Sequence, residues 1–150
     1  MSLRGLAGKV GIVVGGATGL GAATAVRLGA EGSQVVIGDI AEEAAQQTAE
    51  RIARAGVRRH GIGALTRHVA SRWGKEGIRC NAVAPGFTAT DAIRSAPRWP
   101  ELEASALRRI RSTRVGLPDD VASLVAFLLS DEGAWINGQV VNIDGGTVLR

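Results

Sequence analysis

A dense glycine turn near the start of the chain suits phosphate binding. Residues 10–14 form an apolar run, and Gly15-Gly16-Ala17-Thr18-Gly19-Leu20-Gly21 separates it from a helical pattern. Glycines let backbone N–H groups approach a pyrophosphate, and the free N–H groups of a following helix attract the anion. Because the turn stands between an expected strand and an expected helix, it indicates a nucleotide site. The alternative is a plain tight turn in a chain with 21 glycines.

An acidic residue follows the second apolar run. Residues 34–38 read as a buried strand, and Asp39 comes 18 residues after Gly21. A carboxylate at about this spacing accepts hydrogen bonds from an adenosine ribose. The same charge would repel a 2′-phosphate, so NAD is favoured over NADP. Alternatively, Asp39 only caps the next expected helix, over residues 41–53.

Composition limits the classes of protein that the chain can represent. Its 150 residues form one domain, 1–150, large enough for a core, with 45% hydrophobic residues. The sequence shows no membrane-spanning run and no secretion signal, so we expect a cytoplasmic protein without a membrane partner. Cys80 is the single cysteine, which excludes an internal disulfide, and we expect no metal site.

Arginine supplies most of the positive charge. The net charge is +4, and arginines gather in residues 51–59 and 108–114. Such clusters could bind nucleic acid. However, aromatic residues make up only 3% of the chain, and no nucleic-acid motif accompanies the arginines. We therefore expect solvated helix faces and no nucleic-acid partner.

Helical and strand patterns alternate along the chain. Residues 118–130 give the clearest helix, with Pro118 at its start, two acidic residues in its first turn and Gly133 beyond its end. The further predicted helices span residues 20–31, 41–53 and 60–76, and the predicted strands span 10–14, 34–39, 78–84 and 139–143. This alternation is typical of an α/β fold with a parallel sheet.

Several motifs in the same order give the chain a family resemblance. Besides the glycine turn and Asp39, they are Asn81-Ala82-Val83-Ala84-Pro85-Gly86, Arg114-Val115-Gly116-Leu117-Pro118 and Asn137-Gly138-Gln139-Val140-Val141-Asn142-Ile143-Asp144-Gly145-Gly146. The chain resembles short-chain dehydrogenases/reductases over almost its whole length, although Val14 stands where the family commonly has threonine. The resemblance implies a Rossmann-like, doubly wound, mostly parallel sheet.

The resemblance also implies a set of cofactor-binding residues: Gly15, Thr18, Gly19, Leu20, Gly21, Asp39, Ile40, Pro85, Gly86, Thr88 and Thr90. The turn residues would line the pyrophosphate, Asp39 would hold the ribose, and the two threonines would bond the nicotinamide carboxamide. For the threonines, a solvated loop is the alternative. Residues 90–112 correspond to the family's mobile substrate cover, and Pro97 and Pro100 predict an irregular beginning for it.

The family's catalytic residues have no counterpart in this chain. The family uses a tyrosine as acid/base, a lysine four residues later and an upstream serine, yet this chain contains no tyrosine. By alignment with the resembling segments, Ala55 stands at the tyrosine position and Arg59 at the lysine position. The resemblance therefore implies an internal deletion joined near residues 55–59, which removes central strands. We name no catalytic residue, and we expect His60 and His68 to lie at the surface.

The short junction permits three arrangements. A tight turn would make the adjoining helices an antiparallel hairpin and place Pro85 and Gly86 at the wrong end for the cofactor. An extended link over residues 53–61 would keep one parallel sheet with its strands in the order 34–39, 10–14, 78–84 and 139–143, which we favour. Exchange of halves between two chains is the third arrangement.

Three functional hypotheses follow. The first is an NAD-dependent oxidoreductase by descent, acting on an unidentified small molecule by carbonyl/alcohol hydride transfer and catalytically impaired. The second is a non-catalytic nucleotide-binding or oligomerisation remnant. The family resemblance implies a homo-oligomer, to which the apolar residues in 121–129 and 140–149 could contribute; ordinary core packing is the alternative for them. A truncated product without a function of its own is the third reading.

Overall fold

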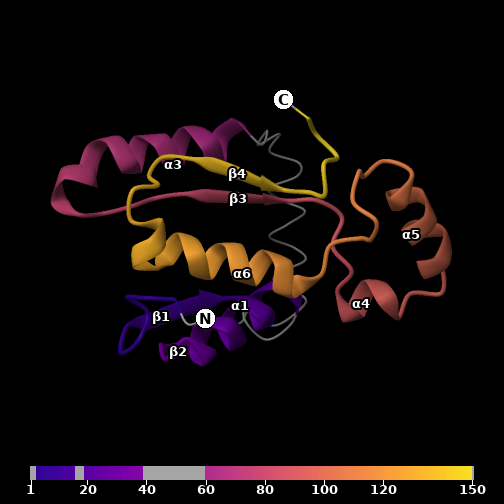
Figure 1. Cartoon of the computed structure of the whole chain (residues 1–150), viewed down its shortest axis with the longest axis horizontal. Helices are drawn as coiled ribbons and strands as arrows, with labels where there is room; N and C mark the ends of the chain where they lie inside the picture. The colour runs from indigo at the N-terminus through magenta and orange to yellow at the C-terminus, as the bar shows by residue number, and fades with distance from the viewer. Residues whose placement is uncertain (1–2, 16–18, 39–59, 150) are drawn as a thin grey trace.

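The computed structural model describes residues 3–15, 19–38 and 60–149 (Figure 1). Asp39, the predicted helix 41–53 and the proposed junction near 55–59 lie outside the described residues. The elements are β1 (Val10–Val14), α1 (Gly19–Ala30), β2 (Gln34–Gly38), α3 (His60–Trp73), η1 (Gly74–Glu76), β3 (Ala82–Pro85), α4 (Asp91–Arg94), α5 (Trp99–Leu107), α6 (Pro118–Leu129), η2 (Asp131–Gly133) and β4 (Val140–Ile143). None of the described helices is long and apolar enough to cross a membrane.

The helices follow the sequence patterns closely. α1 and α6 match their predicted ranges to within one residue at each end. In α6, the Asp120 carboxylate accepts a hydrogen bond from the Leu117 N–H at 2.8 Å and so caps the first turn. α3 ends at Trp73, earlier than predicted, because the chain tightens there into the 3₁₀ turn η1.

The predicted strand 78–84 was too long at its start. β3 begins at Ala82, since the residues before it bond to a loop instead of a strand. The Cys80 N–H donates to Asn137 Oδ1 at 2.8 Å, and the Asn81 side chain accepts from the Gln139 N–H at 3.1 Å. Side-chain amides thus take the place of a backbone ladder over residues 78–81.

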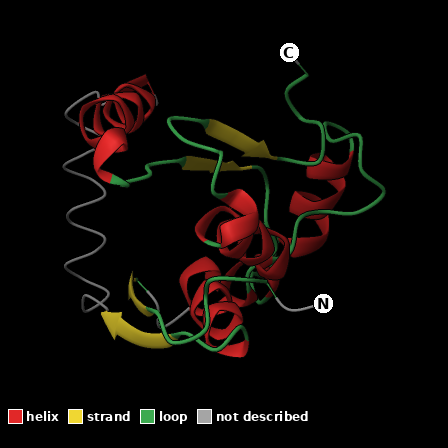
Figure 2. Ribbon diagram, turned by 60° about the vertical axis from the view of Figure 1, so that its left-hand side comes forward, coloured by secondary structure: helices red, strands yellow, loops and turns green. Residues whose placement is uncertain are grey.

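The strands form two separate parallel pairs. β1 pairs with β2, in register from Val10 opposite Gln34, and β3 pairs with β4, in register from Ala82 opposite Val140. The predicted single sheet was wrong in this respect: among the described residues, no pairing joins β1 to β3. Figure 1 shows α6 between the β3–β4 pair and α1, and Figure 2 shows the two pairs well apart.

Two apolar clusters hold these parts together. Leu6, Leu28 and Ala126 are buried against one another and join the N-terminal segment, α1 and α6. The second cluster consists of Ala89, Ala106, Ile110 and Val115, and it fastens α5 over the loop that follows β3. The N-terminal half, residues 3–38, and the C-terminal half, residues 60–149, therefore meet through side chains of Leu6, α1 and α6, and through the hydrogen bond from the Asp131 N–H to the Arg4 carbonyl.

The segment 90–112 is more regular than its prolines predict. Thr90 caps α4 directly, and its Oγ1 accepts from the Ile93 N–H at 3.4 Å. Pro100 lies within the first two positions of α5, where a missing N–H costs nothing because the helix would leave it unpaired. Irregular backbone remains at residues 95–98, between α4 and α5, and at residues 108–112, after α5.

Candidate functional site

The structure describes Gly15 and residues 19–21 of the predicted phosphate turn. Gly15 ends β1 with φ of 74°, and no atom lies within 4 Å of the position that a Cβ would take there. Gly19, Leu20 and Gly21 begin α1, where N–H groups lack partners inside the helix. The first turn of α1 carries no acidic residue. The described part of the turn can therefore accept an anion.

Thr90 lies beside this turn, although it follows β3 in the other half of the molecule. A Cβ placed on Gly19 would stand 3.4 Å from Thr90 Cγ2. Thr90, which follows β3, thus lies against the start of α1, which follows β1. The junction that distinguishes the hairpin, the extended link and the exchanged halves lies outside the described residues. The Thr90 hydroxyl accepts a bond from the Ile93 N–H and keeps its own hydrogen for donation.

Gly86 has no room for a side chain. A Cβ at this position would stand 2.6 Å from the Asp144 Cα, and the Gly86 N–H donates to the Ile143 carbonyl at 3.0 Å. The turn after β3 is therefore held tightly against the end of β4. Pro85 is the last residue of β3 and is exposed. The resemblance places both residues on the nicotinamide side of the site.

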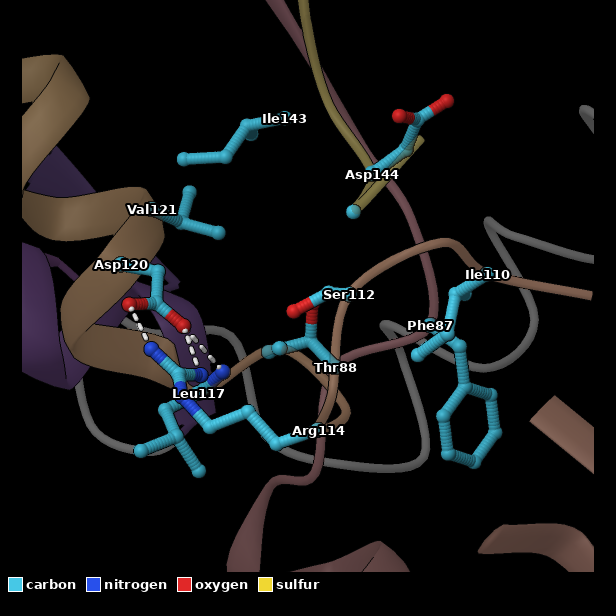
Figure 3. Close-up of a pocket in the computed structure, with 12 residues that line it drawn as sticks. Phe87, Thr88, Ile110, Ser112, Arg114, Leu117, Asp120, Val121, Ile143 and Asp144 are labelled. Atoms are coloured by element: carbon cyan, nitrogen blue, oxygen red, sulfur yellow. Dashed lines mark hydrogen bonds and ion pairs between the residues drawn. The ribbon is translucent and has the colours of Figure 1, made fainter. Parts of the chain in front are cut away.

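Thr88 points into a pocket of about 220 Å³ between this loop, α6 and the end of β4 (Figure 3). Its side chain is buried, and its hydroxyl donates to the Gly86 carbonyl at 3.1 Å. Ser112 and Asp120 face the same pocket. Thr88 and Thr90 therefore occupy different surroundings, and only Thr90 reaches the glycine turn.

Arg114 and Asp120 form a two-pronged ion pair at the mouth of this pocket. The guanidinium Nη1 lies 2.7 Å from Asp120 Oδ2, and Nη2 lies 2.8 Å from Oδ1. Hydrogen bonds from Arg114 lower the pKa of the Asp120 carboxyl, and the Leu117 N–H adds to this effect. Sequence reasoning had placed Arg114 on a solvated face and missed this pair. The capping position of Asp120 was the signal that could have found it.

The described residues around the pocket offer no base that is free to take a proton. Asp120 accepts bonds from Arg114 and Leu117, and Asp144 accepts from the N–H groups of Gly146 and Val148, each at 3.0 Å. His68 is exposed and packs edge-on against Trp73, in accord with the prediction. The side chain of His60 lies outside the description. Among the described residues, no group of acidic, histidine or cysteine side chains could hold a metal ion.

A larger pocket opens on the other side of the residue 85–87 turn. Its volume is about 640 Å³, and α3, the ends of β3 and β4, α5 and the C-terminal segment surround it. Phe87 lines both pockets, and its ring stacks on Trp99 with centroids 6.3 Å apart. The expected substrate cover, residues 90–112, therefore borders both pockets.

The structure thus places eight of the eleven predicted cofactor residues. Gly15 follows β1, and Gly19, Leu20 and Gly21 begin α1, where Gly19 lies beside Thr90. Pro85 ends β3, and Gly86 and Thr88 follow it. Thr18, Asp39 and Ile40 lie outside the described residues. Their ribose and phosphate roles stay predictions.

Comparison with known families identifies this architecture. Residues 53–148 match a model described as enoyl-(acyl carrier protein) reductase, and residues 9–64 match the short chain dehydrogenase model. The first match alone covers more than half of the chain. The chain belongs to the short-chain dehydrogenase/reductase family of oxidoreductases, whose members use nicotinamide cofactors.

Individual relatives agree with this assignment. An uncharacterized oxidoreductase of Mycobacterium tuberculosis is 39% identical over 95 residues, which are 63% of this chain and 38% of the relative. The 3-oxoacyl-[acyl-carrier-protein] reductase of Thermotoga maritima is 40% identical over 89 residues, 59% of this chain and 35% of the relative. The matches thus span little more than a third of these relatives.

A solved structure supports the fold. The ligand-free aldohexose dehydrogenase of Thermoplasma acidophilum superposes with a TM-score of 0.79 at 20% identity, covering 99% of this chain and 97% of the other. At this identity the likeness concerns the fold alone. The Rossmann-like α/β architecture that the sequence predicts is therefore confirmed.

Proposed function

We propose that this chain binds a nicotinamide dinucleotide, NAD in preference to NADP, and that its hydride transfer is impaired. The approach of Thr90 to Gly19 carries this proposal, because it brings the two halves of a dinucleotide site together although their strands do not pair. Gly15, Gly19, Leu20 and Gly21 would hold the pyrophosphate with backbone N–H groups. The bound cofactor would supply or accept a hydride at its nicotinamide.

The cofactor preference rests on Asp39. A carboxylate at the end of the second strand accepts bonds from the two ribose hydroxyls and repels a 2′-phosphate. An Asp39→Ser variant should therefore lose NADH affinity and reduce the preference over NADPH. A family neighbour of known structure, a candidate 2-deoxy-D-gluconate 3-dehydrogenase from Agrobacterium tumefaciens, carries bound NADP. NADPH therefore has to be titrated alongside NADH.

The impairment follows from the residues that are missing. The sequence contains no tyrosine, and its two lysines, Lys9 and Lys75, do not follow the family's spacing. Loss of a positioned acid/base costs about 10²–10⁴-fold in rate. We therefore expect carbonyl reduction with NADH to be at least this much slower than in intact family members.

Calorimetric titration with NADH and NADPH tests the proposal. We expect saturable NADH binding and weaker NADPH binding. No binding at millimolar NADH would refute it. Turnover at an ordinary rate with a broad set of carbonyl compounds would leave the binding claim intact and overturn the impairment.

A matched pair of glycine variants assigns the binding to the turn. Gly15→Ala places a side chain at φ of 74°, which costs about 1–3 kcal/mol and obstructs the backbone approach to phosphate. NADH affinity should fall by about tenfold or more. Gly29→Ala in α1 is the control, because no atom lies within 4 Å of the position that its Cβ would take. This variant should leave NADH affinity unchanged. Circular dichroism verifies that both variants fold.

The second candidate function is a binding or oligomerisation remnant without catalysis. Exposed apolar side chains favour it: Leu129, Val140, Val148 and Leu149 are 44–76% exposed. A homo-oligomer, including one with exchanged halves, would cover them. Sedimentation of the purified protein over a concentration series tests this, and a monomer at all concentrations would contradict it.

We expect the protein in the cytoplasm.

A further inference from the structure

The larger pocket beside the proposed cofactor site has an unusual charge. We call it the arginine pocket; Arg67 from α3 and Arg109 from the turn after α5 line it, together with Gly86, Phe87, Asn142 and Asp144. Neither arginine has a carboxylate partner among the described residues. Four other arginines do: Arg4, Arg27, Arg98 and Arg114 each lie within 4.0 Å of an acidic side chain.

The acidic residue in this wall does not cancel the positive charge. The Asp144 carboxylate accepts one hydrogen bond from the Gly146 N–H and another from the Val148 N–H, so its own loop uses both oxygens. In Figure 3 its side chain points away from the smaller pocket. Two positive charges and one negative charge therefore line the pocket, which leaves it with a net positive charge.

The position of Arg67 increases this charge locally. Its Nη1 and Nη2 atoms lie 3.5 and 3.8 Å from the place that a Cβ on Gly63 would occupy. The guanidinium is thus directed back along α3, towards the helix start at His60. The first turn of a 14-residue helix adds the positive end of its dipole. A larger side chain at residue 63 would crowd this guanidinium.

The pocket also lies next to the proposed nicotinamide position. It shares Gly86 and Phe87 with the loop that continues to Thr90, and Thr90 approaches the glycine turn at Gly19. We propose that the arginine pocket binds the anionic group, a carboxylate or a phosphate, of a small molecule. We further propose that this small molecule is the substrate of the family-type reaction, and this part rests on the proposed function. The binding of an anion in the arginine pocket does not depend on the proposed function.

Titration with succinate and with inorganic phosphate at low salt tests the proposal, and neutral succinamide is the control ligand. We expect saturable binding of at least one anion and none of succinamide. In the double variant Arg67→Gln/Arg109→Gln, binding should weaken by about tenfold or more, since each charged hydrogen bond contributes strongly. Added salt should weaken it too.

Arg108→Gln is the matched control variant. It removes the same charge beside Arg109 from an exposed position that does not line the pocket, and anion binding should stay within about twofold. Equal binding by the wild type and the double variant would overturn the proposal. So would the absence of saturable binding by either anion. The thermal melting curve of each variant verifies that it is folded.

Two further measurements separate this proposal from the cofactor claim. Inorganic phosphate could also bind the glycine turn. If Gly15→Ala abolishes phosphate binding and Arg67→Gln/Arg109→Gln does not, the result counts against the arginine pocket. NADH titrations are made on the same proteins. Loss of succinate binding with NADH binding retained assigns the anion to the arginine pocket. Wild-type succinate binding without NADH binding refutes the proposed function alone.

Discussion

The turn at the end of β3 requires a residue without a Cβ, and Gly86 supplies it. A Cβ on Gly86 would meet the Asp144 Cα at 2.6 Å and the Asp144 Cβ at 2.8 Å. Both atoms belong to Asp144, the residue directly after β4, and the last residue of β4, Ile143, is fixed by pairing with β3. Gly86→Ala should therefore force the strands apart and lower the free energy of unfolding by about 1–3 kcal/mol.

Urea unfolding measures this loss. Gly29→Ala again serves as the control, because it adds a methyl group to an open helical position and should be neutral or stabilising by up to about 1 kcal/mol. If Gly86→Ala unfolds at the wild-type midpoint, the close approach to Asp144 does not restrain the turn.

Glu132 makes stability depend on acid pH. The Arg4 guanidinium donates to Glu132 Oε1 at 2.8 Å and holds the pKa of this carboxyl at about 2, below its usual 4.5. The unfolded chain therefore takes up a proton at a higher pH than the folded chain. The contribution is complete above about pH 4.5 and is lost as the pH falls towards 2.

A Glu132→Gln variant should flatten this part of the curve. The midpoints of urea unfolding are measured for the variant and the wild type between about pH 6 and about pH 2, and their pH dependence is compared. Glu103→Gln, in α5, is the control, and its curve should run parallel to that of the wild type. Parallel curves for Glu132→Gln and wild type would contradict the assigned role of the Arg4 pair.

Arg79 closes the C-terminal end of α6. Its Nη1 donates to the carbonyl of Leu128 at 2.6 Å and to that of Gly133 at 3.0 Å, and a weaker bond reaches Ile136 at 3.3 Å. Leu128 lies in the last turn of α6, where carbonyls have no partner within the helix, and a cation there interacts favourably with the helix dipole. One guanidinium therefore ties the start of β3 to the end of α6.

Removing this side chain should cost more than a surface substitution. We expect Arg79→Leu to lower the free energy of unfolding by about 2–3 kcal/mol, measured by urea titration. Arg79→Lys should recover only part, since an ammonium lacks the planar fork that spans several carbonyls. Arg108→Leu, at an exposed position, is the control. Equal stability of Arg79→Leu and Arg108→Leu would refute the capping role.

Sequence patterns predicted the elements better than their assembly. α1, α3 and α6 were found because each needs an apolar stripe and end signals that are local in the chain. The start of β3 was missed because residues 78–81 bond to Asn137 and Gln139, which no local pattern reveals. The Arg114–Asp120 pair, by contrast, joins residues only six apart, and the capping position of Asp120 was its signal in the sequence. Long-range partners of polar groups depend on the tertiary fold.

The separation into two strand pairs was also unpredictable. Which strands pair depends on what occupies the space between them, and here α6 packs against α1 in that region. Gly19 and Thr90 nevertheless lie side by side, as the family resemblance implies. The described part of the candidate site was therefore predictable from motifs, and its surroundings were not.

A cofactor that contacts both halves should stabilise the whole molecule. Gly19 belongs to the first half and Thr90 to the second, so a dinucleotide held between them opposes their separation. At about 100 times its Kd, NADH should add about 2.7 kcal/mol to the free energy of unfolding. For a chain of this size the melting temperature should rise by about 5–10 °C.

A thermal melt with and without NADH checks this expectation, and Gly15→Ala should abolish the shift. A rise that Gly15→Ala leaves intact would place the nucleotide elsewhere on the protein.

The contact between α1 and α6 also affects how this molecule can change in evolution. A ladder of backbone bonds fixes the relative offset of two strands, whereas helices in contact require only that their side chains fit. Leu28 packs against Ala126, and Arg27 donates to Ser123 Oγ at 2.9 Å. The fit between the two halves therefore depends on the side chains that α1 and α6 present to each other. Compensating substitutions for a change in α1 should therefore arise along α6, while β3 and β4 diverge independently of β1 and β2.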